Sequence, residues 1–80
     1  MKIYWDGKSK NIIGQRVRAI RHSYQTPITQ LQLAERLQLA GYEIDRITIV
    51  RIEQGSRFVP DYEVKAIAQV LGVTPNDLLY

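Results

Sequence analysis

Residues 29–55 constrain the fold of this chain more than any other stretch. They read TQLQLAERLQLAGYEIDRITIVRIEQG, with Thr29 and Asp45 at positions suited to helix starts and Gly55 at the far end. A side-chain oxygen before the first turn and a glycine after the last turn are signals that begin and end helices. The stretch therefore predicts two short amphipathic helices, over 29–40 and 46–54, joined by a turn at Gly41 and Tyr42.

The second of these segments carries conflicting local signals. Its run ITIVRI is rich in β-branched residues, which on propensity alone favours a strand. Asp45 as N-cap and Gly55 as stop favour a helix instead, and no neighbouring strand is available for pairing. A helix with Ile49 and Ile52 buried is therefore predicted. Its other residues include too many cations and β-branched side chains for a helix that only packs on the core, which indicates a surface that contacts another molecule. These residues are Arg46, Ile47, Thr48, Val50 and Arg51.

A helix is also predicted over 12–24, because Ile13, Val17 and Ile20 recur at helical spacing. Pro27 restricts the residue before it and so ends this segment. Arg21 follows Val17 by four residues and lies on or beside the core-facing stripe. A cation in that place needs a partner.

Two more helices are predicted near the C-terminus. Apolar residues at helical spacing over 61–71 are followed by Gly72 as the stop. Thr74, Pro75 and Asp77 then form a capping-box pattern with proline at the first helical position. The resulting expectation is an N-terminal arm over 1–10 followed by one all-α domain over 11–80. Within the arm, Trp5 is expected to pack on the core or on a partner subunit, with stacking on a ligand as the alternative.

Length and charge narrow the functional classes. A chain of 80 residues buries only about 60% of its unfolded surface, so a second subunit would stabilise it. There is no cysteine, no apolar signal-peptide run, and no stretch close to the ~20 apolar residues that span a bilayer, so we expect a cytoplasmic protein without membrane attachment. The net charge is +3, with seven cations against two anions before residue 37. This distribution indicates a surface that meets a polyanion, with an ordinary solvated surface as the alternative.

Catalytic and metal chemistry have little basis in the sequence. His22 is the only histidine, and no glycine-rich phosphate loop is present. Without cysteine or a second histidine, neither a catalytic triad nor a zinc ligand set can be assembled. We expect no enzyme activity and no cofactor.

Four motifs in order carry a family resemblance: IIGQRVRAIR, TQLQLAERL, ITIVRIEQG and AIAQVLGVTPNDLL. Together they resemble the helix-turn-helix domain of phage repressors and Cro, the xenobiotic-response-element type of transcriptional regulator. The resemblance covers residues 12–79 and implies a compact five-helix, lambda-repressor-like fold. It also implies that the third helix lies in the DNA major groove and that the second crosses the backbone.

The resemblance implies roles for individual residues. Arg21 corresponds to the first-helix arginine that pairs with a glutamate near the end of the third helix, here Glu53; direct phosphate contact by Arg21 is the alternative. Thr29 and Gln30, and Ser56 and Arg57, are the expected phosphate contacts, although Thr29 could serve only as a cap and Arg57 could be merely solvated. The expected base contacts are Arg46, Ile47, Thr48 and Arg51.

One segment departs from the family pattern. Ala34 and Ile49 are fifteen residues apart, which is longer than the family spacing, so residues 38–42 look like an insertion. Either the second helix gains a turn or the loop bulges. The position of the third helix in the groove depends on which occurs.

The sequence thus predicts a regulator, most simply a repressor, that binds an inverted-repeat operator in double-stranded DNA as a homodimer. Leu78, Leu79, Tyr80 and the Trp5 arm are candidate dimer surfaces, with core packing as the alternative. A second hypothesis is a protein-interaction module of the antitoxin or controller type on the same fold. A third is a minimal structural bundle without a ligand.

Overall fold

The computed structural model describes residues 8–80 and contains five α-helices: α1 (Gly14–Ser23), α2 (Gln30–Leu39), α3 (Arg46–Gln54), α4 (Asp61–Leu71) and α5 (Pro75–Leu79). The described residues form no β-strand, so the all-α fold predicted from the sequence is confirmed. Residues 1–7, with the expected role of Trp5, lie outside the described part.

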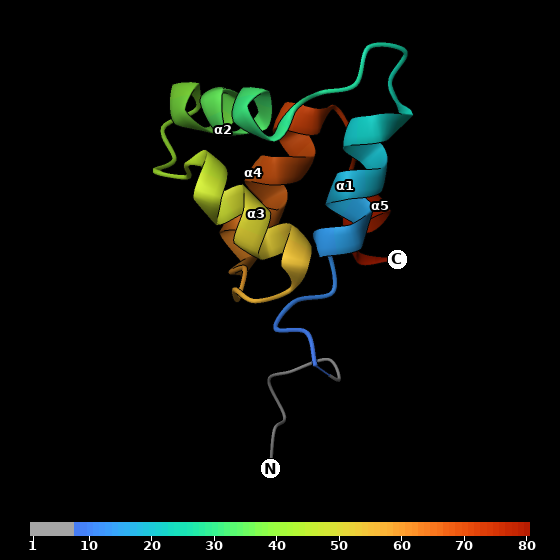
Figure 1. Cartoon of the computed structure of the whole chain (residues 1–80), viewed down its shortest axis with the longest axis vertical. Helices are drawn as coiled ribbons and strands as arrows, with labels where there is room; N and C mark the ends of the chain where they lie inside the picture. The colour runs from blue at the N-terminus through green and yellow to red at the C-terminus, as the bar shows by residue number, and fades with distance from the viewer. Residues whose placement is uncertain (1–7) are drawn as a thin grey trace.

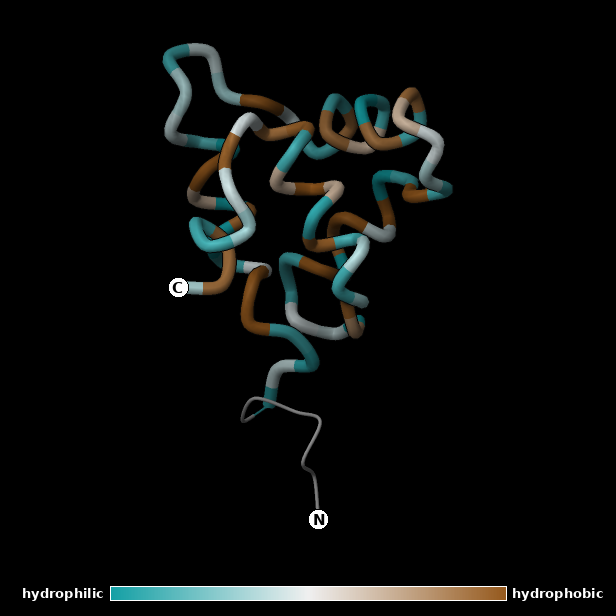
Figure 2. Tube along the Cα trace, turned by 180° about the vertical axis from the view of Figure 1, so that it is seen from behind, coloured by the Kyte–Doolittle hydropathy of each residue, from teal (hydrophilic) through white to brown (hydrophobic). Residues whose placement is uncertain are grey.

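Each helix packs against two others, so that the five helices form a ring of neighbours. In Figure 1, α2 lies at the upper left, α1 and α5 lie at the right, and α3 crosses in front of α4. α4 packs against α2 and α5, while α3 packs against both α1 and α2. Apolar and polar residues recur along every helix (Figure 2), and the apolar ones supply a single buried cluster centred on Val17, Leu33, Ile49, Ile67 and Leu78.

The start and stop signals read from the sequence are used by the helices. Thr29 and Thr74 each close a capping box, with Gln32 and Asp77 respectively. Gly55 and Gly72 end α3 and α4 in the left-handed conformation. The difference lies at α1, which is shorter than the predicted 12–24. α4 begins at Asp61 as predicted, with Pro60 as its N-cap.

The longer connection between α2 and α3 is a loop. α2 ends at Leu39, so the extra residues do not lengthen the helix. The turn closes through Gly41 at φ 97° and through the Tyr42 amide, which donates to the Leu37 carbonyl at 2.9 Å. Ile44 is fully buried, and Gln38 donates to its carbonyl at 3.2 Å. These contacts anchor the loop and set where α3 begins.

None of the helices in residues 8–80 has the length and apolar character needed to cross a membrane. The C-terminal residues differ in their packing. Leu78 is buried, Leu79 is partly buried against the core, and Tyr80 is 82% exposed. Of the candidate dimer surfaces at this end, only Tyr80 is fully available to another molecule.

Candidate nucleic-acid interface

The N-terminus of α3 is held by its cap. Asp45 Oδ1 accepts from the backbone amide of Thr48 at 2.8 Å and from the Thr48 hydroxyl at the same distance. The hydrogen bond from the Thr48 backbone amide is the main cause that lowers the pKa of Asp45, followed by the hydrogen bond from the Thr48 hydroxyl. The positive charge of Arg51 lowers this pKa further. The carboxylate therefore stays ionised at neutral pH and complements the positive end of the helix dipole.

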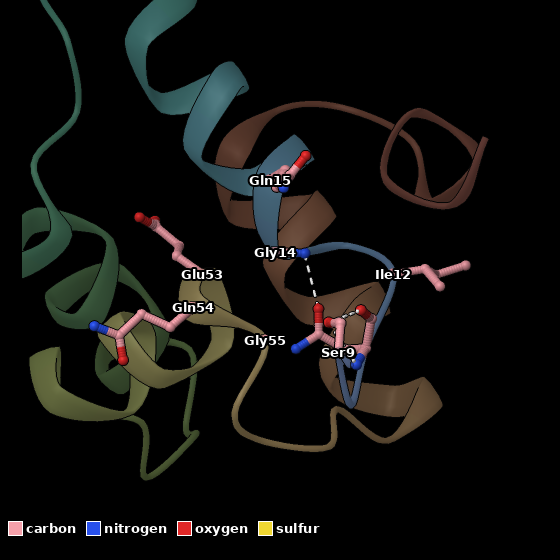
Figure 3. Close-up of a pocket in the computed structure, with 8 residues that line it drawn as sticks. Ser9, Ile12, Gly14, Gln15, Glu53, Gln54 and Gly55 are labelled. Carbon is pink, nitrogen blue, oxygen red and sulfur yellow. Dashed lines mark hydrogen bonds between the residues drawn. The ribbon is translucent and has the colours of Figure 1, made fainter. Parts of the chain in front are cut away.

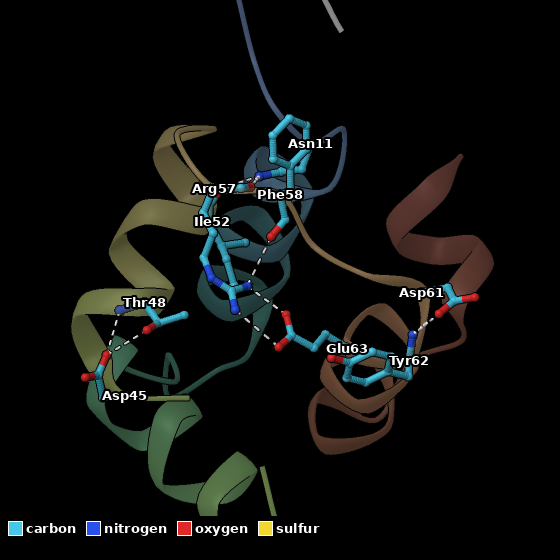
Figure 4. A network of polar contacts seen from close by, with 9 residues as sticks. All are labelled: Asn11, Asp45, Thr48, Ile52, Arg57, Phe58, Asp61, Tyr62 and Glu63. Carbon is cyan, nitrogen blue, oxygen red and sulfur yellow. Dashed lines mark hydrogen bonds and ion pairs between the residues drawn. The ribbon is translucent and has the colours of Figure 1, made fainter. Parts of the chain in front are cut away.

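The C-terminus of α3 is held by Asn11, which sequence reasoning did not single out. Its amide nitrogen donates to the carbonyls of Ile52, at 3.1 Å, and Arg57, at 2.8 Å, while its oxygen accepts from the amides of Ile13 and Gly14. One side chain thus joins the start of α1 to the end of α3 and to the loop beyond it; Figure 4 shows Asn11 with Ile52 and Arg57. The only sequence signal for this role was the position of Asn11, a polar residue three positions before the start of α1.

Close backbone approach accompanies this contact. A Cβ added to Gly14 would lie 2.3 Å from the Ile52 carbonyl oxygen, so only glycine fits between α1 and α3 there. The backbone amide of Lys10 donates to the Gly55 carbonyl at 2.7 Å. The expected arm therefore joins the domain at residues 8–10, against the end of α3.

A third restraint on α3 is the ion pair between Arg21 and Glu53, which is formed. Arg21 Nε donates to Glu53 Oε2 at 2.6 Å and Nη2 donates to Oε1 at 2.7 Å. The two side chains are only 6% and 5% exposed. Arg21 Nη1 also donates to the buried Ile28 carbonyl, and Gln30 donates to Glu53 Oε1 at 3.1 Å. The cluster joins α1, the start of α2 and the end of α3.

With its ends fixed, α3 presents one outer face to solvent. Ile47 is 57% exposed, and Arg51, four residues later, lies on the same face because an α-helix turns about 100° per residue. Val50 and Gln54 complete this face, and Arg46 flanks it. We call Ile47, Val50, Arg51 and Gln54 the outer face of α3. Gln54 was missed from the sequence, although its i+7 spacing from Ile47 could have found it.

The structure places the expected base contacts in two settings. Arg46, Ile47 and Arg51 are exposed on or beside the outer face. Thr48 lies three residues before Arg51, at the edge of this face, and is half-buried with its hydroxyl bonded to Asp45. The Thr48 hydroxyl therefore completes the cap of α3.

The expected phosphate contacts all have partners within the chain. In the capping box, the Thr29 hydroxyl accepts from the Gln32 backbone amide and the Thr29 backbone amide donates to the Gln32 side chain. The Gln30 side chain donates to Glu53. The Ser56 hydroxyl donates to the Arg51 carbonyl at 3.2 Å. Thr29 and Ser56 are still exposed, so their oxygens can face a ligand as well.

Arg57 has a partner within the chain that the sequence did not indicate, so it is not merely solvated. Its Nη1 donates to Glu63 Oε1 at 2.7 Å, across the loop that precedes α4 (Figure 4). The hydrogen bond to Glu63 is the first cause that raises the pKa of Arg57. Glu63 is buried and was not a candidate in the sequence, since nothing in its spacing indicated a partner in the loop. A ligand phosphate would compete with this carboxylate for the Arg57 guanidinium.

Comparisons of the chain with protein-family models, curated proteins and solved structures found no match. The structure therefore defines the class of protein at a coarse level: a small all-α domain of five helices with an exposed, partly cationic face on α3.

Proposed function

We propose that this chain is a sequence-specific double-stranded DNA-binding protein, a transcriptional regulator of the phage repressor and Cro type that acts by occupying an operator. In this proposal α2, the 40–45 loop and α3 form a helix-turn-helix with an extended turn. The observation that carries the proposal is the outer face of α3: it is exposed, flanked by Arg46 and includes Arg51, and both ends of the helix are fixed.

The side chains on α3 suit direct contact with base edges in the major groove. Arg46 and Arg51 can each donate two hydrogen bonds to guanine O6 and N7, and Ile47 can pack against a thymine methyl group. A good bidentate contact is worth about 1–3 kcal/mol of discrimination against the wrong base. Gln54 adds an amide that can bond to adenine N6 and N7. Fixed helix ends support this role because they keep these side chains in one register.

The proposal includes a homodimer on an inverted repeat. Two α3 helices would then enter successive major grooves about 34 Å apart. Tyr80, exposed at the C-terminus, and Ile12, exposed before α1, are among the exposed apolar residues of the described part that are available for a contact between subunits.

A selection from random duplexes followed by gel shift tests this function. Wild type is expected to enrich one inverted-repeat sequence, and Arg51→Ala is expected to lose preference at one base pair in each half-site. Lys65→Ala, an exposed cation on α4, is the control and should select the same sequence as wild type. Failure to enrich any duplex at low salt would rule the function out.

A second candidate function has support from exposed apolar side chains. Leu31 and Leu39 on α2 are 55% and 90% exposed, and Ile47 on α3 is 57% exposed. Exposed apolar groups of this kind also suit a protein-interaction module of the antitoxin or controller type. Elution with an unrelated chain, together with no enrichment of any duplex, would favour this alternative.

A further inference from the structure

A groove follows α1 along its junction with α3. Three adjoining hollows make it up, and all of them include Glu53 in their lining. The first lies beside Gly14, Gln15 and Gln54 (Figure 3), and the last reaches the start of α2. We call this the α1 groove; the side chains used below are Gln15, Arg18, His22, Gln30, Val50 and Gln54.

The charge in the α1 groove is positive. Glu53 is the only carboxylate that lines it among residues 8–80, and both of its oxygens already accept from Arg21, with Gln30 as a further donor. Arg18 and His22 are exposed. Within the described part of the chain, no hydrogen bond or ion pair holds the side chain of either residue. The charge of Arg18 therefore faces solvent uncompensated, while the carboxylate in the floor is neutralised.

The spacing of the polar groups suits an extended anion. Gln15, Arg18 and His22 occupy positions i, i+3 and i+7, so they lie in a row on one face of α1. Seven residues of α-helix rise about 10 Å, so the row extends well beyond the size of one small anion. Gln54 and Val50 of the outer face of α3 stand in the opposite wall. A strand lying in the groove would run beside α3.

We propose that the α1 groove binds the phosphodiester backbone of one DNA strand, with Arg18 as the principal phosphate contact and Gln15 and His22 as further donors. This inference rests on the proposed function and assigns to α1 a role that the sequence had placed on α2 and the 56–57 loop. Amide and guanidinium donors in a row carry no base information. They add affinity for any duplex and hold α3 in register beside the strand.

The test is the salt dependence of binding to a mixed-sequence duplex of about two helical turns. Each phosphate neutralised contributes about 0.9 to the slope of log K against log salt. Arg18→Gln should reduce this slope by about 0.9. Wild type should thus lose about 3.5-fold more affinity than Arg18→Gln between 50 and 200 mM salt.

Arg16→Gln is the matched control. It removes the same charge from α1, but Arg16 is two residues away on the helix and its Nη1 donates to the Asp77 carbonyl on α5. Its slope should equal that of wild type. A second pair, Gln15→Glu and Gln69→Glu, adds a carboxylate inside and outside the groove, and only Gln15→Glu should weaken duplex binding several-fold.

The outcomes separate the two proposals. Duplex binding by wild type with equal slopes for Arg18→Gln and Arg16→Gln overturns the phosphate groove and leaves the proposed function standing. Absence of duplex binding by wild type at low salt overturns both. Circular dichroism of the four variants checks that each is folded, as expected for exposed positions.

Discussion

Removing one member of the Arg21–Glu53 pair should remove a large part of the domain's unfolding free energy. Arg21→Met leaves the Glu53 carboxylate, 5% exposed, without its cation. Loss of one partner of a buried pair typically costs about 3–5 kcal/mol. A chain of 80 residues has a total unfolding free energy of about 4–12 kcal/mol. The single variant should therefore lower Tm by about 12 °C or more, since 1 kcal/mol shifts Tm by about 4–8 °C at this size.

The double variant Arg21→Met/Glu53→Met should be more stable than either single variant. It removes both charges, and the main loss left is the donor to the buried Ile28 carbonyl. An unsatisfied buried acceptor costs about 1–3 kcal/mol. A double-mutant cycle should consequently give a coupling energy of about 3 kcal/mol or more.

Urea unfolding followed by far-UV circular dichroism measures all four corners of the cycle. Lys65→Met, at an exposed position on α4 where no hydrogen bond or ion pair within residues 8–80 holds the side chain, is the control and should change the unfolding free energy by less than about 0.5 kcal/mol. Single variants that each lose less than 1 kcal/mol, or losses that simply add, would refute the assignment of this pair as the tie between α1 and α3.

Three further predictions concern the same region and the helix caps. Gly14→Ala should destabilise the fold by about 1–3 kcal/mol, because the new Cβ meets the Ile52 carbonyl, which is backbone and cannot move alone; urea unfolding measures this, and an unchanged midpoint would contradict it. Asn11→Ala should cost about 2 kcal/mol, because it leaves the Arg57 carbonyl without its donor and leaves the Ile52 carbonyl with the Gly55 amide alone; hydrogen exchange should rise first at the end of α3. Hydrogen bonds from the backbone amides of Thr48 and Thr74 lower the pKa of Asp45 and Asp77, respectively, below the ordinary 3.8. The two ionised carboxylates therefore stabilise the fold above that pH, and this stabilisation is lost as the pH falls through the lowered pKa values. Stability should therefore decline below about pH 4, and less steeply in the Asp45→Asn/Asp77→Asn variant; equal pH profiles would contradict this.

Local signals were sufficient to predict the helices. Asp45 and Gly55 flank a run of residues whose β-propensity favours a strand. The run forms a helix because both caps provide hydrogen-bond partners for the helix ends and no strand is near for pairing. Ile49 and Ile52 were expected to be buried, and they are fully buried. The Thr74 capping box was likewise readable from four consecutive residues. These features depend only on near neighbours in the chain.

The contacts that fix α3 in space depend on distant residues. Asn11 reaches the Ile52 carbonyl and Arg57 reaches Glu63, and neither partner is indicated by spacing. Arg21 could be paired with Glu53 only through the family resemblance. A buried cation needs an anionic partner, but its position in the sequence does not show which carboxylate that is. The capping role of Thr48 was missed although its signal is local. A side chain three residues after an aspartate cap can bond back to that cap, and it does so here.

The most direct test of the central claim is to map the duplex onto the chain by NMR. The selected duplex, or a mixed-sequence one at low salt, is titrated into the ¹⁵N-labelled protein and amide shifts are followed. We expect the largest shift changes on α3 from Arg46 to Gln54, with a second group along Gln15, Arg18 and His22. Changes confined to α4 and α5, with α3 unmoved, would contradict DNA binding through the outer face of α3.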